Sequence, residues 1–436
     1  MARASRARVA DTLGRVSWQV SRLHVRTRVV ADAGELLLHT DALRPQAMVR
    51  RGDGLVGRGE TLRAEFSGPG RVAAAREWFA QLTELAEVSD AAAVPGSGLV
   101  AFGSFVFDDR SSTNSVLTIP QVVVGRRDGV SFATEISAAP LTDTDAVALL
   151  DAAPLGLDAR CELAAPEGER ERHRTAVGDA ISRIRRGQLS KVVVARRAFG
   201  QLTRETDLRH VLRRLAATYT NTWTYAADGQ LGASPEMLVR VLRGEVAARV
   251  LAGTVARGNG DIADAAARES LRVSAKNRAE HRFAVESALE SLRTLDSHDD
   301  PAGGLTASPE PFLLQLPNVW HLASDLRGRM PAGSSPLNLV EALHPTAAVG
   351  GTPTAAAMDA ILELEAFDRG RYAGPTGWLS AAGDGEWVVS LRGASVDASG
   401  HVAALAGGGI MAASHADDEW DETESKLAPV RQALQP

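Results

Sequence analysis

Six carboxylates lie within the eight residues after Ala416, in the segment DDEWDETE. If this segment is helical, Glu419 and Glu422 share one face, because side chains three residues apart are neighbours on a helix. Carboxylate oxygens are the ligands that Mg²⁺ prefers. An acidic first turn also complements the helix dipole without any metal. By itself, the segment therefore predicts either a solvated helix start or half of a metal site.

A second candidate metal ligand is Glu280, in the segment SAKNRAEHRFAVESALE. On a helix, Glu280 shares its face with Phe283, Ala284 and Ser287, three, four and seven residues on. A carboxylate on such an apolar, small-residue face is costly unless it is paired or bound to a metal. The neighbouring His281 points about 100° away around the helix, and we expect it to be structural.

Two further residues have the properties of a general base and a general acid. Lys191 belongs to the predicted strand LSKVVVARRAF and keeps apolar neighbours whichever face is buried. Desolvation lowers the pKa of a lysine, and a neutral lysine is a competent base. Glu236 follows Pro235 at the start of another strand, and a glutamate in an apolar cleft can act as an acid near neutrality. A strand-end lysine that reaches water and an exposed turn glutamate are the alternatives.

Three more features suit the binding of anions. Arg392 lies in the middle of the predicted apolar strand VVSLRGA, where a guanidinium needs a partner such as a carboxylate. Gly407, Gly408 and Gly409 offer backbone N–H groups unobstructed by side chains. Tyr372 is one of only three tyrosines and supplies a hydroxyl. Together with the base, the acid and the carboxylates, these features fit a small dianionic substrate whose chemistry moves protons and hydroxyls.

The elements that must position these residues are mostly strand pairs and long helices. We expect short strands over much of 15–160, a connector at 151–171, and hairpins at 236–254 and 386–410. Helices are predicted over 71–88, 208–219, 264–295 and 416–433, and up to Gly187, with Ser414 and Asp417 as a capping box at the last one. Without βαβ alternation, the pattern indicates an α+β chain with mostly antiparallel sheets.

Composition excludes several classes of protein. The 436 residues are 44% hydrophobic and carry a net charge of −6, which is ordinary for a soluble globular protein. There is no basic stripe with interleaved aromatic residues, so we expect no nucleic acid partner. The longest apolar stretch near the N-terminus, LVAFGSFVF, is nine residues long and too short for a bilayer, so we expect no membrane association. The single cysteine, Cys161, and the absence of a secretory signal favour a cytoplasmic protein.

Nine motifs in order resemble the chorismate-utilising enzymes, and isochorismate synthases most closely. They are SKVVVARR, GASPEMLVR, LAGTVARG, SAKNRAEH, VWHLASDLRG, LHPTAAVGGTP, RYAGPTGW, EWVVSLRGA and LAGGGIMAAS with DEWDETESK. The resemblance implies one large domain over 1–436, with two antiparallel sheets packed as a sandwich and helices outside. Residues 1–165 would form its variable portion and 170–432 its catalytic portion.

The resemblance also implies a role for each matching residue. Lys191 matches the base that activates water for attack at C2 of chorismate, and Glu236 matches the acid that protonates the leaving C4 hydroxyl. Mg²⁺ would hold the ring carboxylate. The matching metal ligands are Glu280 and Glu422, with Glu419 beside them. The matching substrate-binding residues are Gly253, Thr254, His321, Ala348, Tyr372, Leu391, Arg392, Gly407 and Gly409.

Two positions distinguish isochorismate synthases from related enzymes of the resembled family that catalyse other reactions. Enzymes that use ammonia commonly have glutamine where Lys191 stands, so the lysine favours water. Salicylate synthases, which go on to eliminate pyruvate, typically have threonine where Ala348 stands, so this chain is expected to stop at isochorismate. A non-catalytic chorismate-binding homologue is the third alternative. Gly393 and Gly408 stand where serine and alanine are common.

The product would feed either menaquinone or catecholate siderophore biosynthesis. We expect a monomer whose partner is the small molecule chorismate and whose only cofactor is Mg²⁺.

Lys191 must be neutral to act as the base. Lowering the pKa of a lysine from about 10.4 toward 7 requires about 4–5 kcal/mol of differential stabilisation of the neutral form.

Overall fold

The computed structural model describes residues 9–10, 16–17, 22–142, 148–203, 205–258, 260–293, 305–315, 319–330 and 334–435. Beyond residue 22, the backbone alone is described for eight residues within these ranges: Thr254, Ala256, Lys276, Glu280, Ser287, Ser291, Arg293 and Val319. Thr254 and Glu280 are both predicted site residues, so their side chains lie outside the description.

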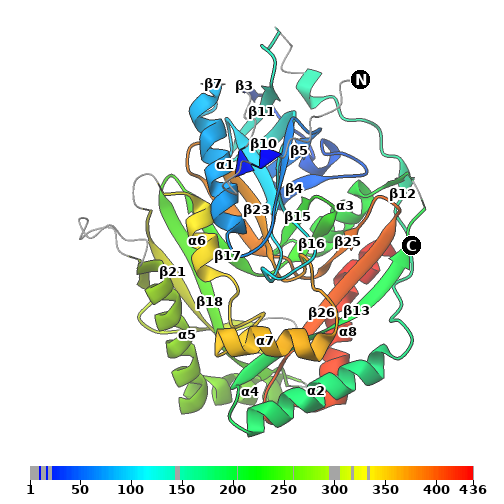
Figure 1. Ribbon diagram of the computed structural model, residues 1–436, viewed down its shortest axis with the longest axis vertical. Helices are drawn as coiled ribbons and strands as arrows, with labels where there is room; N and C mark the ends of the chain where they lie inside the picture. Colours follow the sequence, from blue (N-terminus) through cyan, green and yellow to red (C-terminus); the bar gives the residue numbers. More distant parts are fainter. Residues whose placement is uncertain are drawn as a thin grey trace.

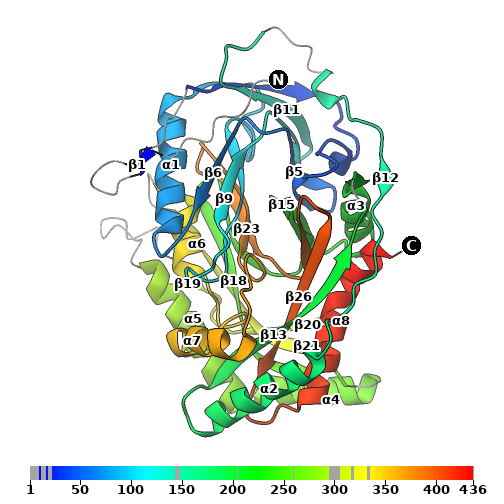
Figure 2. The same ribbon diagram turned by 45° about the vertical axis from the view of Figure 1, so that its right-hand side comes forward.

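Two large sheets form the framework (Figures 1 and 2). The twelve-stranded sheet has the order β22 (Gly351–Thr352), β13 (Lys191–Gln201), β26 (His401–Ile410), β25 (Gly393–Val396), β16 (Gln230–Ser234), β15 (Trp223–Ala227), β4 (Gln46–Arg50), β5 (Asp53–Arg58), β10 (Val122–Arg127), β11 (Val130–Ser137), β3 (His24–Val30) and β7 (Glu87–Asp90). The ten-stranded sheet has the order β19 (Thr306–Ala307), β21 (Val319–Arg329), β18 (Glu245–Ala256), β17 (Met237–Leu242), β24 (Gly385–Val389), β23 (Pro375–Ser380), β8 (Val100–Ser104), β9 (Ser115–Ile119) and β6 (Leu62–Phe66), with β20 (Phe312–Gln315) paired to β21. Two-stranded pairs join β1 (Val9–Ala10) to β2 (Val16–Ser17) and β12 (Leu157–Asp158) to β14 (Thr206–Asp207).

Both sheets draw strands from the two halves of the chain, so the N-terminal and C-terminal portions are built into one body. Every described pair within the two large sheets is antiparallel except β3 with β7. The largest apolar core contains Leu55 and Phe132 of one sheet and Phe102 and Leu117 of the other. Antiparallel sheets stacked on a shared apolar core are the sandwich that the sequence predicts.

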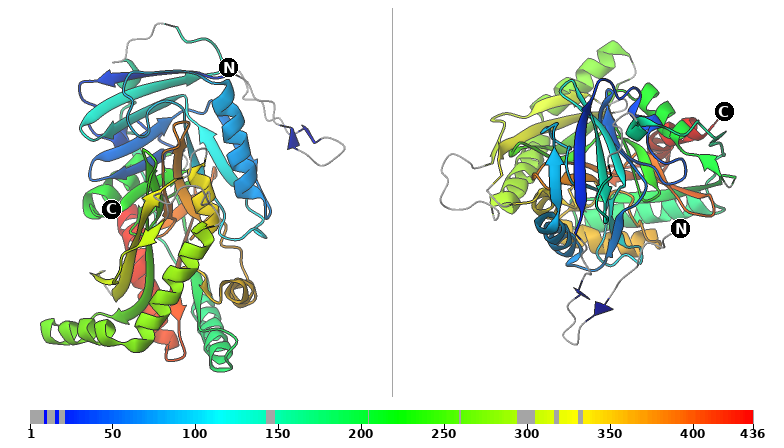
Figure 3. Two further views of the ribbon diagram at one scale, coloured as in Figure 1. Left: turned by 90° about the vertical axis from the view of Figure 1, so that its left-hand side faces the viewer. Right: turned by 90° about the horizontal axis from the view of Figure 1, so that it is seen from above.

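Helices cover the outside of the sheets (Figure 3). Their bounds are α1 (Arg71–Leu85), α2 (Glu169–Arg185), α3 (Arg209–Thr218), α4 (Asp261–Val273), α5 (Ala275–Arg293), α6 (Pro336–Leu343), α7 (Thr354–Glu365) and α8 (Ala416–Leu434), with 3₁₀ turns η1 (Leu36–Leu38) and η2 (Ala148–Leu150). Helices α2 and α7 pack on β13, α8 packs on β26, and α5 packs on β18. These helices therefore support the strands that carry Lys191, Gly407 and Gly253.

Two predictions about helix ends are wrong. The expected single helix over 264–295 is divided into α4 and α5 at Ser274, whose backbone is extended. The Ser274 hydroxyl accepts from the backbone N–H of Asn277 at 3.2 Å, as an N-cap of a new helix does. The expected capping box at the start of α8 does not form either. His415 is the N-cap residue, and the Ser414 hydroxyl donates to Glu419 instead.

The chain crosses between the two sheets at two adjacent places. Strand β16 belongs to the twelve-stranded sheet and β17 to the ten-stranded sheet, with Pro235 and Glu236 between them. Strand β24 crosses back to β25 through residues 390–392. The predicted hairpin at 386–410 therefore contains a break: Arg392 lies at the crossing, not in the middle of a strand as the sequence suggested.

Candidate active site

The two crossings are joined to one another, and this junction fixes Glu236 and Arg392. The Ser234 hydroxyl donates to the Val389 carbonyl at 2.6 Å, and the Val389 N–H donates to the Glu236 carbonyl at 3.1 Å. The Ala233 N–H donates to the Arg392 carbonyl at 3.2 Å. Backbone bonds therefore hold the acid candidate and the anion-binding candidate against each other.

Arg392 adopts a left-handed backbone conformation, with φ of 53°. This conformation costs a non-glycine residue about 1–2 kcal/mol, so its surroundings must impose it. The buried Tyr225 hydroxyl donates to the carbonyl of the preceding Leu391 at 3.1 Å. An added Cβ at Gly232 or at Gly393 would lie 2.6 Å from that hydroxyl. The glycine at 393 therefore makes room for Tyr225.

Lys191 begins β13 and pairs with Thr352 of β22 on one side. On the other side, β13 pairs with β26, and an added Cβ at Gly409 would lie 2.8 Å from the Lys191 Cε. The lysine side chain therefore lies across the bare backbone of Gly409. A larger residue at 409 would push the lysine side chain from this position.

The three glycines form a strand edge rather than a loop. The Tyr372 hydroxyl interacts with the Gly407 N–H. Because alternate residues of a strand point to opposite edges and faces, Gly407 and Gly409 share one edge and the face of Lys191. An added Cβ at Gly408 would instead overlap the Glu419 carboxylate on the opposite face. Alanine at 408 would displace that carboxylate.

Tyr372 is held by a buried ion pair beneath it. Arg369 donates to Glu365 at 2.8 Å, and also to the carbonyls of Val349 and Val193, each at 2.9 Å. The Arg369 guanidinium lies 5.9 Å from the centre of the Tyr372 ring. One cation thus ties the tyrosine to β13 and to the loop before β22. Ala348 belongs to that loop, and Leu391 packs at the edge of the large core.

Sequence reasoning missed Lys426, which occupies the centre of this arrangement. Its Nζ donates to the Gly407 carbonyl at 2.8 Å and forms an ion pair with Glu422 one turn earlier on α8. Burial lowers the pKa of Lys426. The spacing from Glu422 was visible in the sequence as an i,i+4 pair.

The charges of neighbouring groups act on two of the predicted residues, Glu236 and His321. Burial raises the pKa of Glu236, while the charges of Lys191, Arg392 and Lys426 act in the opposite direction. Burial lowers the pKa of His321 to about 4, with further contributions from Lys191 and Lys426. His321 is therefore neutral near pH 7. A buried acid with a raised pKa beside several cations is typical of catalytic sites.

Gly253 positions the helix that carries Glu280. It forms a bulge in β18 with φ of 79°, between Ala252 and Thr254. An added Cβ would lie 3.2 Å from the Asn277 carbonyl on α5, so glycine allows close packing of this helix. The strand register places Thr254 opposite His321. The buried His281 bonds to the Ala252 carbonyl and to Ser324, as expected for a structural histidine.

The predicted metal ligands on α8 include an unpartnered buried oxygen. Glu419 accepts from Ser414 at 2.6 Å through Oε1, while its Oε2 is buried without a hydrogen-bond partner. Burial raises the pKa of Glu419, and the charge of Glu422 raises it further. Among residues with described side chains, no group of three or more potential ligands forms a metal centre. Glu280 stands outside that comparison, so the metal site stays a prediction.

Comparison with known proteins identifies the family. A family model described as "Chorismate binding enzyme" matches residues 47–435, and the chain belongs to this family. A putative isochorismate synthase, MenF, from Mycobacterium tuberculosis is 41% identical over 263 residues, covering 57% of this chain and 68% of the relative. The salicylate biosynthesis isochorismate synthase of Pseudomonas aeruginosa is 38% identical over 290 residues. That match covers 64% of this chain but only 58% of the relative's length.

Solved structures agree with the fold. A putative 2,3-dihydroxybenzoate-specific isochorismate synthase, DhbC, from Bacillus anthracis superposes with a TM-score of 0.70 at 26% identity, covering 92% of this chain and 99% of that one. MenF of Escherichia coli gives a TM-score of 0.72 at 23% identity over 95% of both chains, which supports the fold alone. Among the helices within the described ranges, none is both long and apolar enough to cross a membrane.

Proposed function

We propose that this protein is an isochorismate synthase, which converts chorismate reversibly to isochorismate. The observation that best supports the proposal is the junction of the two sheet crossings, which joins the segments of Glu236 and Arg392. The charge of Lys191 acts on the Glu236 carboxyl at this junction. Relatives named isochorismate synthases support the same reaction. The second half of the Pseudomonas aeruginosa name, salicylate biosynthesis, makes pyruvate elimination the competing outcome to test.

In the proposed reaction, Lys191 as a neutral amine takes a proton from water while the water oxygen bonds to C2 of chorismate. The ring double bonds shift, and Glu236 gives its proton to the C4 hydroxyl, which leaves as water. One water is consumed and one is released, so the step is an isomerisation without redox change. Arg392, Tyr372 and the N–H groups of Gly407 and Gly409 bind the enolpyruvyl carboxylate.

Mg²⁺ is the proposed cofactor, and the residues present suit it. Glu280 and Glu422 would hold the ion, with Glu419 beside them. The unpartnered buried Oε2 of Glu419, close to the charge of Glu422, is the feature of this structure that a cation would satisfy. When bound, Mg²⁺ supplies positive charge to the ring carboxylate of the substrate.

Lys191→Met tests the assignment of the base. Purified protein is incubated with chorismate and Mg²⁺, and isochorismate and pyruvate are both quantified by chromatography. We expect wild type to form isochorismate without pyruvate, and the variant to lose about 10²–10⁴-fold in kcat. Gln201→Ala, at the exposed far end of the same strand, is the matched control. Stoichiometric pyruvate would assign a salicylate synthase, and turnover by neither protein would favour a non-catalytic homologue.

The pathway and the physical state follow as further proposals. The product would enter menaquinone or catecholate siderophore biosynthesis, since relatives named MenF and DhbC are both similar to this chain. We propose that the protein acts as a cytoplasmic monomer, and light scattering of the purified protein would test its oligomeric state.

A further inference from the structure

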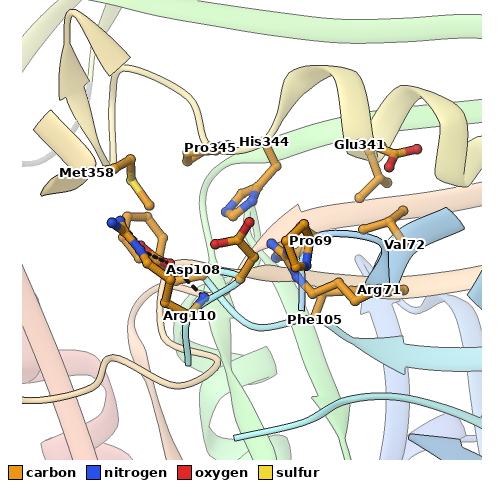
Figure 4. A pocket seen from close by; sticks show the side chains of 14 residues that line it. Pro69, Arg71, Val72, Phe105, Asp108, Arg110, Glu341, His344, Pro345 and Met358 are labelled. Atoms are coloured by element: carbon orange, nitrogen blue, oxygen red, sulfur yellow. Dashed lines mark hydrogen bonds and ion pairs between the residues drawn. The ribbon is translucent and has the colours of Figure 1, made fainter. Parts of the chain in front are cut away.

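A cavity of about 300 Å³ lies between α1, α6, α7 and the loop that joins β8 to β9 (Figure 4). It shares no lining residue with the candidate active site. Its apolar wall includes Phe105, Phe107, Val72, Val340 and Met358. The volume reaches the lower end of the range for small-molecule sites, about 300 Å³. The cavity is therefore large enough for a compact organic ligand.

Arg71 supplies a poorly satisfied cation in this cavity. Its two terminal nitrogens donate over long distances, 3.5 Å to the Gly68 carbonyl and 3.4 Å to the Val106 carbonyl. Its Nε is buried without a partner. Arg71 forms no ion pair with any side chain in the described part of the protein, and burial lowers its pKa. A half-buried guanidinium in this state favours an anion with acceptor oxygens.

The neighbouring charged groups are paired elsewhere or do not contact Arg71, so Arg71 can bind a ligand anion. Arg110 donates to both Asp108 oxygens, at 2.8 and 2.7 Å, so the charge of Asp108 is compensated. Glu341 is paired with Arg76 at 3.2 Å. The charges of Asp109, Asp108 and Glu341 all act on Arg71, but none of these carboxylates pairs with it. Asp109 is partly exposed. His344 donates to the Ala373 carbonyl at 3.0 Å, and burial lowers its pKa to about 4, so it is neutral.

We propose that this cavity is an effector site for a small carboxylic acid with a compact apolar body. The carboxylate would bind Arg71, and the apolar body would pack against Phe105 and Phe107. The cavity is linked to the candidate active site through His344, which bonds to Ala373 next to Tyr372. A ligand in the cavity is therefore expected to alter turnover of chorismate, and this expectation rests on the proposed function. The binding of the ligand itself does not depend on that function.

The binding test uses 4-fluorobenzoate as the probe, observed by ¹⁹F NMR. Arg392→Gln serves as the background in every protein tested, so that carboxylate binding at the candidate active site is suppressed. We expect saturable binding that Arg71→Gln weakens by about 10- to 100-fold, the value of one charge-assisted hydrogen bond. Arg160→Gln removes the same charge from an exposed arginine that neither lines the cavity nor pairs with a lining residue, and it should bind normally. The uncharged 4-fluorobenzamide should bind at least about tenfold more weakly than the acid.

Three results would overturn the proposal. They are no saturable binding of the acid, equal binding of the amide, and binding that Arg71→Gln leaves unchanged. Thermal unfolding checks that Arg71→Gln is folded. Met358→Trp, which fills the cavity from a partly exposed position, should independently abolish binding. In the protein with Arg392 intact, 4-fluorobenzoate should change turnover of chorismate in a way that Arg71→Gln abolishes. If 4-fluorobenzoate binds but no turnover of chorismate is observed, the proposed function is wrong while the proposed ligand site is still supported.

Discussion

Glu236→Gln separates the chemical role of this carboxyl from its structural one. Glutamine has the same shape as glutamate and leaves two backbone hydrogen bonds of residue 236 intact. Its carbonyl accepts from the Val389 N–H, and its N–H donates to the Ser234 hydroxyl. It cannot give a proton to a leaving hydroxyl. General acid catalysis contributes about 10²–10⁴-fold, so we expect kcat to fall by that factor, equivalent to about 3–5 kcal/mol of transition-state stabilisation.

The same substitution has a predictable effect on stability. Burial raises the pKa of Glu236 above its ordinary value of 4.5. A carboxyl with a raised folded-state pKa stabilises the fold below the unfolded-state pKa, and this contribution is lost as the pH rises through the folded-state pKa. Glutamine does not titrate. The variant should therefore gain stability relative to wild type as the pH rises from 4.5.

The assay combines both readouts on one preparation. Isochorismate formation is followed by chromatography at saturating chorismate and Mg²⁺, and unfolding is followed by urea titration at several pH values. Glu236→Asp is the control that retains an ionisable acid with a shorter reach. A Glu236→Gln enzyme within about threefold of the wild-type kcat would refute the acid assignment. Loss of activity together with lower stability at every pH would reduce Glu236 to a structural role.

Three other substitutions test the parts that support the site. Tyr225→Phe removes the hydrogen bond to the Leu391 carbonyl, next to Arg392. We expect the free energy of unfolding to fall by about 0.5–1.5 kcal/mol and the KM for chorismate to rise. An unchanged KM would show that this hydrogen bond does not hold the left-handed backbone at Arg392. Glu365→Gln leaves the buried Arg369 without its charged partner. Urea unfolding should show that the free energy of unfolding falls by about 3–5 kcal/mol. A fall of less than about 1 kcal/mol would show that the pair does not stabilise the fold. Glu422→Gln should raise the Mg²⁺ concentration needed for half-maximal rate while Asp421→Asn, exposed on the same helix, does not, and equal effects would argue against a metal ligand at 422.

Sequence patterns predicted an α+β chain with mostly antiparallel sheets because that feature depends on local periodicity. The sandwich and the roles of the site residues came instead from the resemblance in motif order. The hairpin at Arg243–Gly244 and the strand that begins at Lys191 both follow alternation and turn residues that are visible in the sequence. The break at Ser274 was also signalled locally, since a serine followed three residues later by Asn277 is compatible with an N-cap.

The crossing at Arg392 was not predictable in this way. VVSLRGASV alternates like a single strand, yet the chain leaves one sheet and enters the other within it. The left-handed backbone there is imposed by Tyr225, which is distant in sequence, and by the space that Gly232 and Gly393 leave. Lys426 was missed for a related reason. Its partner Glu422 is local, but its contact with Gly407 depends on how α8 packs on β26.

The most direct test of the account follows the oxygen of water through the reaction. Chorismate and Mg²⁺ are incubated with the protein in ¹⁸O-labelled water, and isochorismate is analysed by mass spectrometry before the reverse reaction becomes significant. Addition of water at C2 with loss of the C4 hydroxyl predicts one labelled oxygen in each product molecule, located at C2. Isochorismate that carries no label would contradict a water nucleophile activated by Lys191 and a hydroxyl released by Glu236.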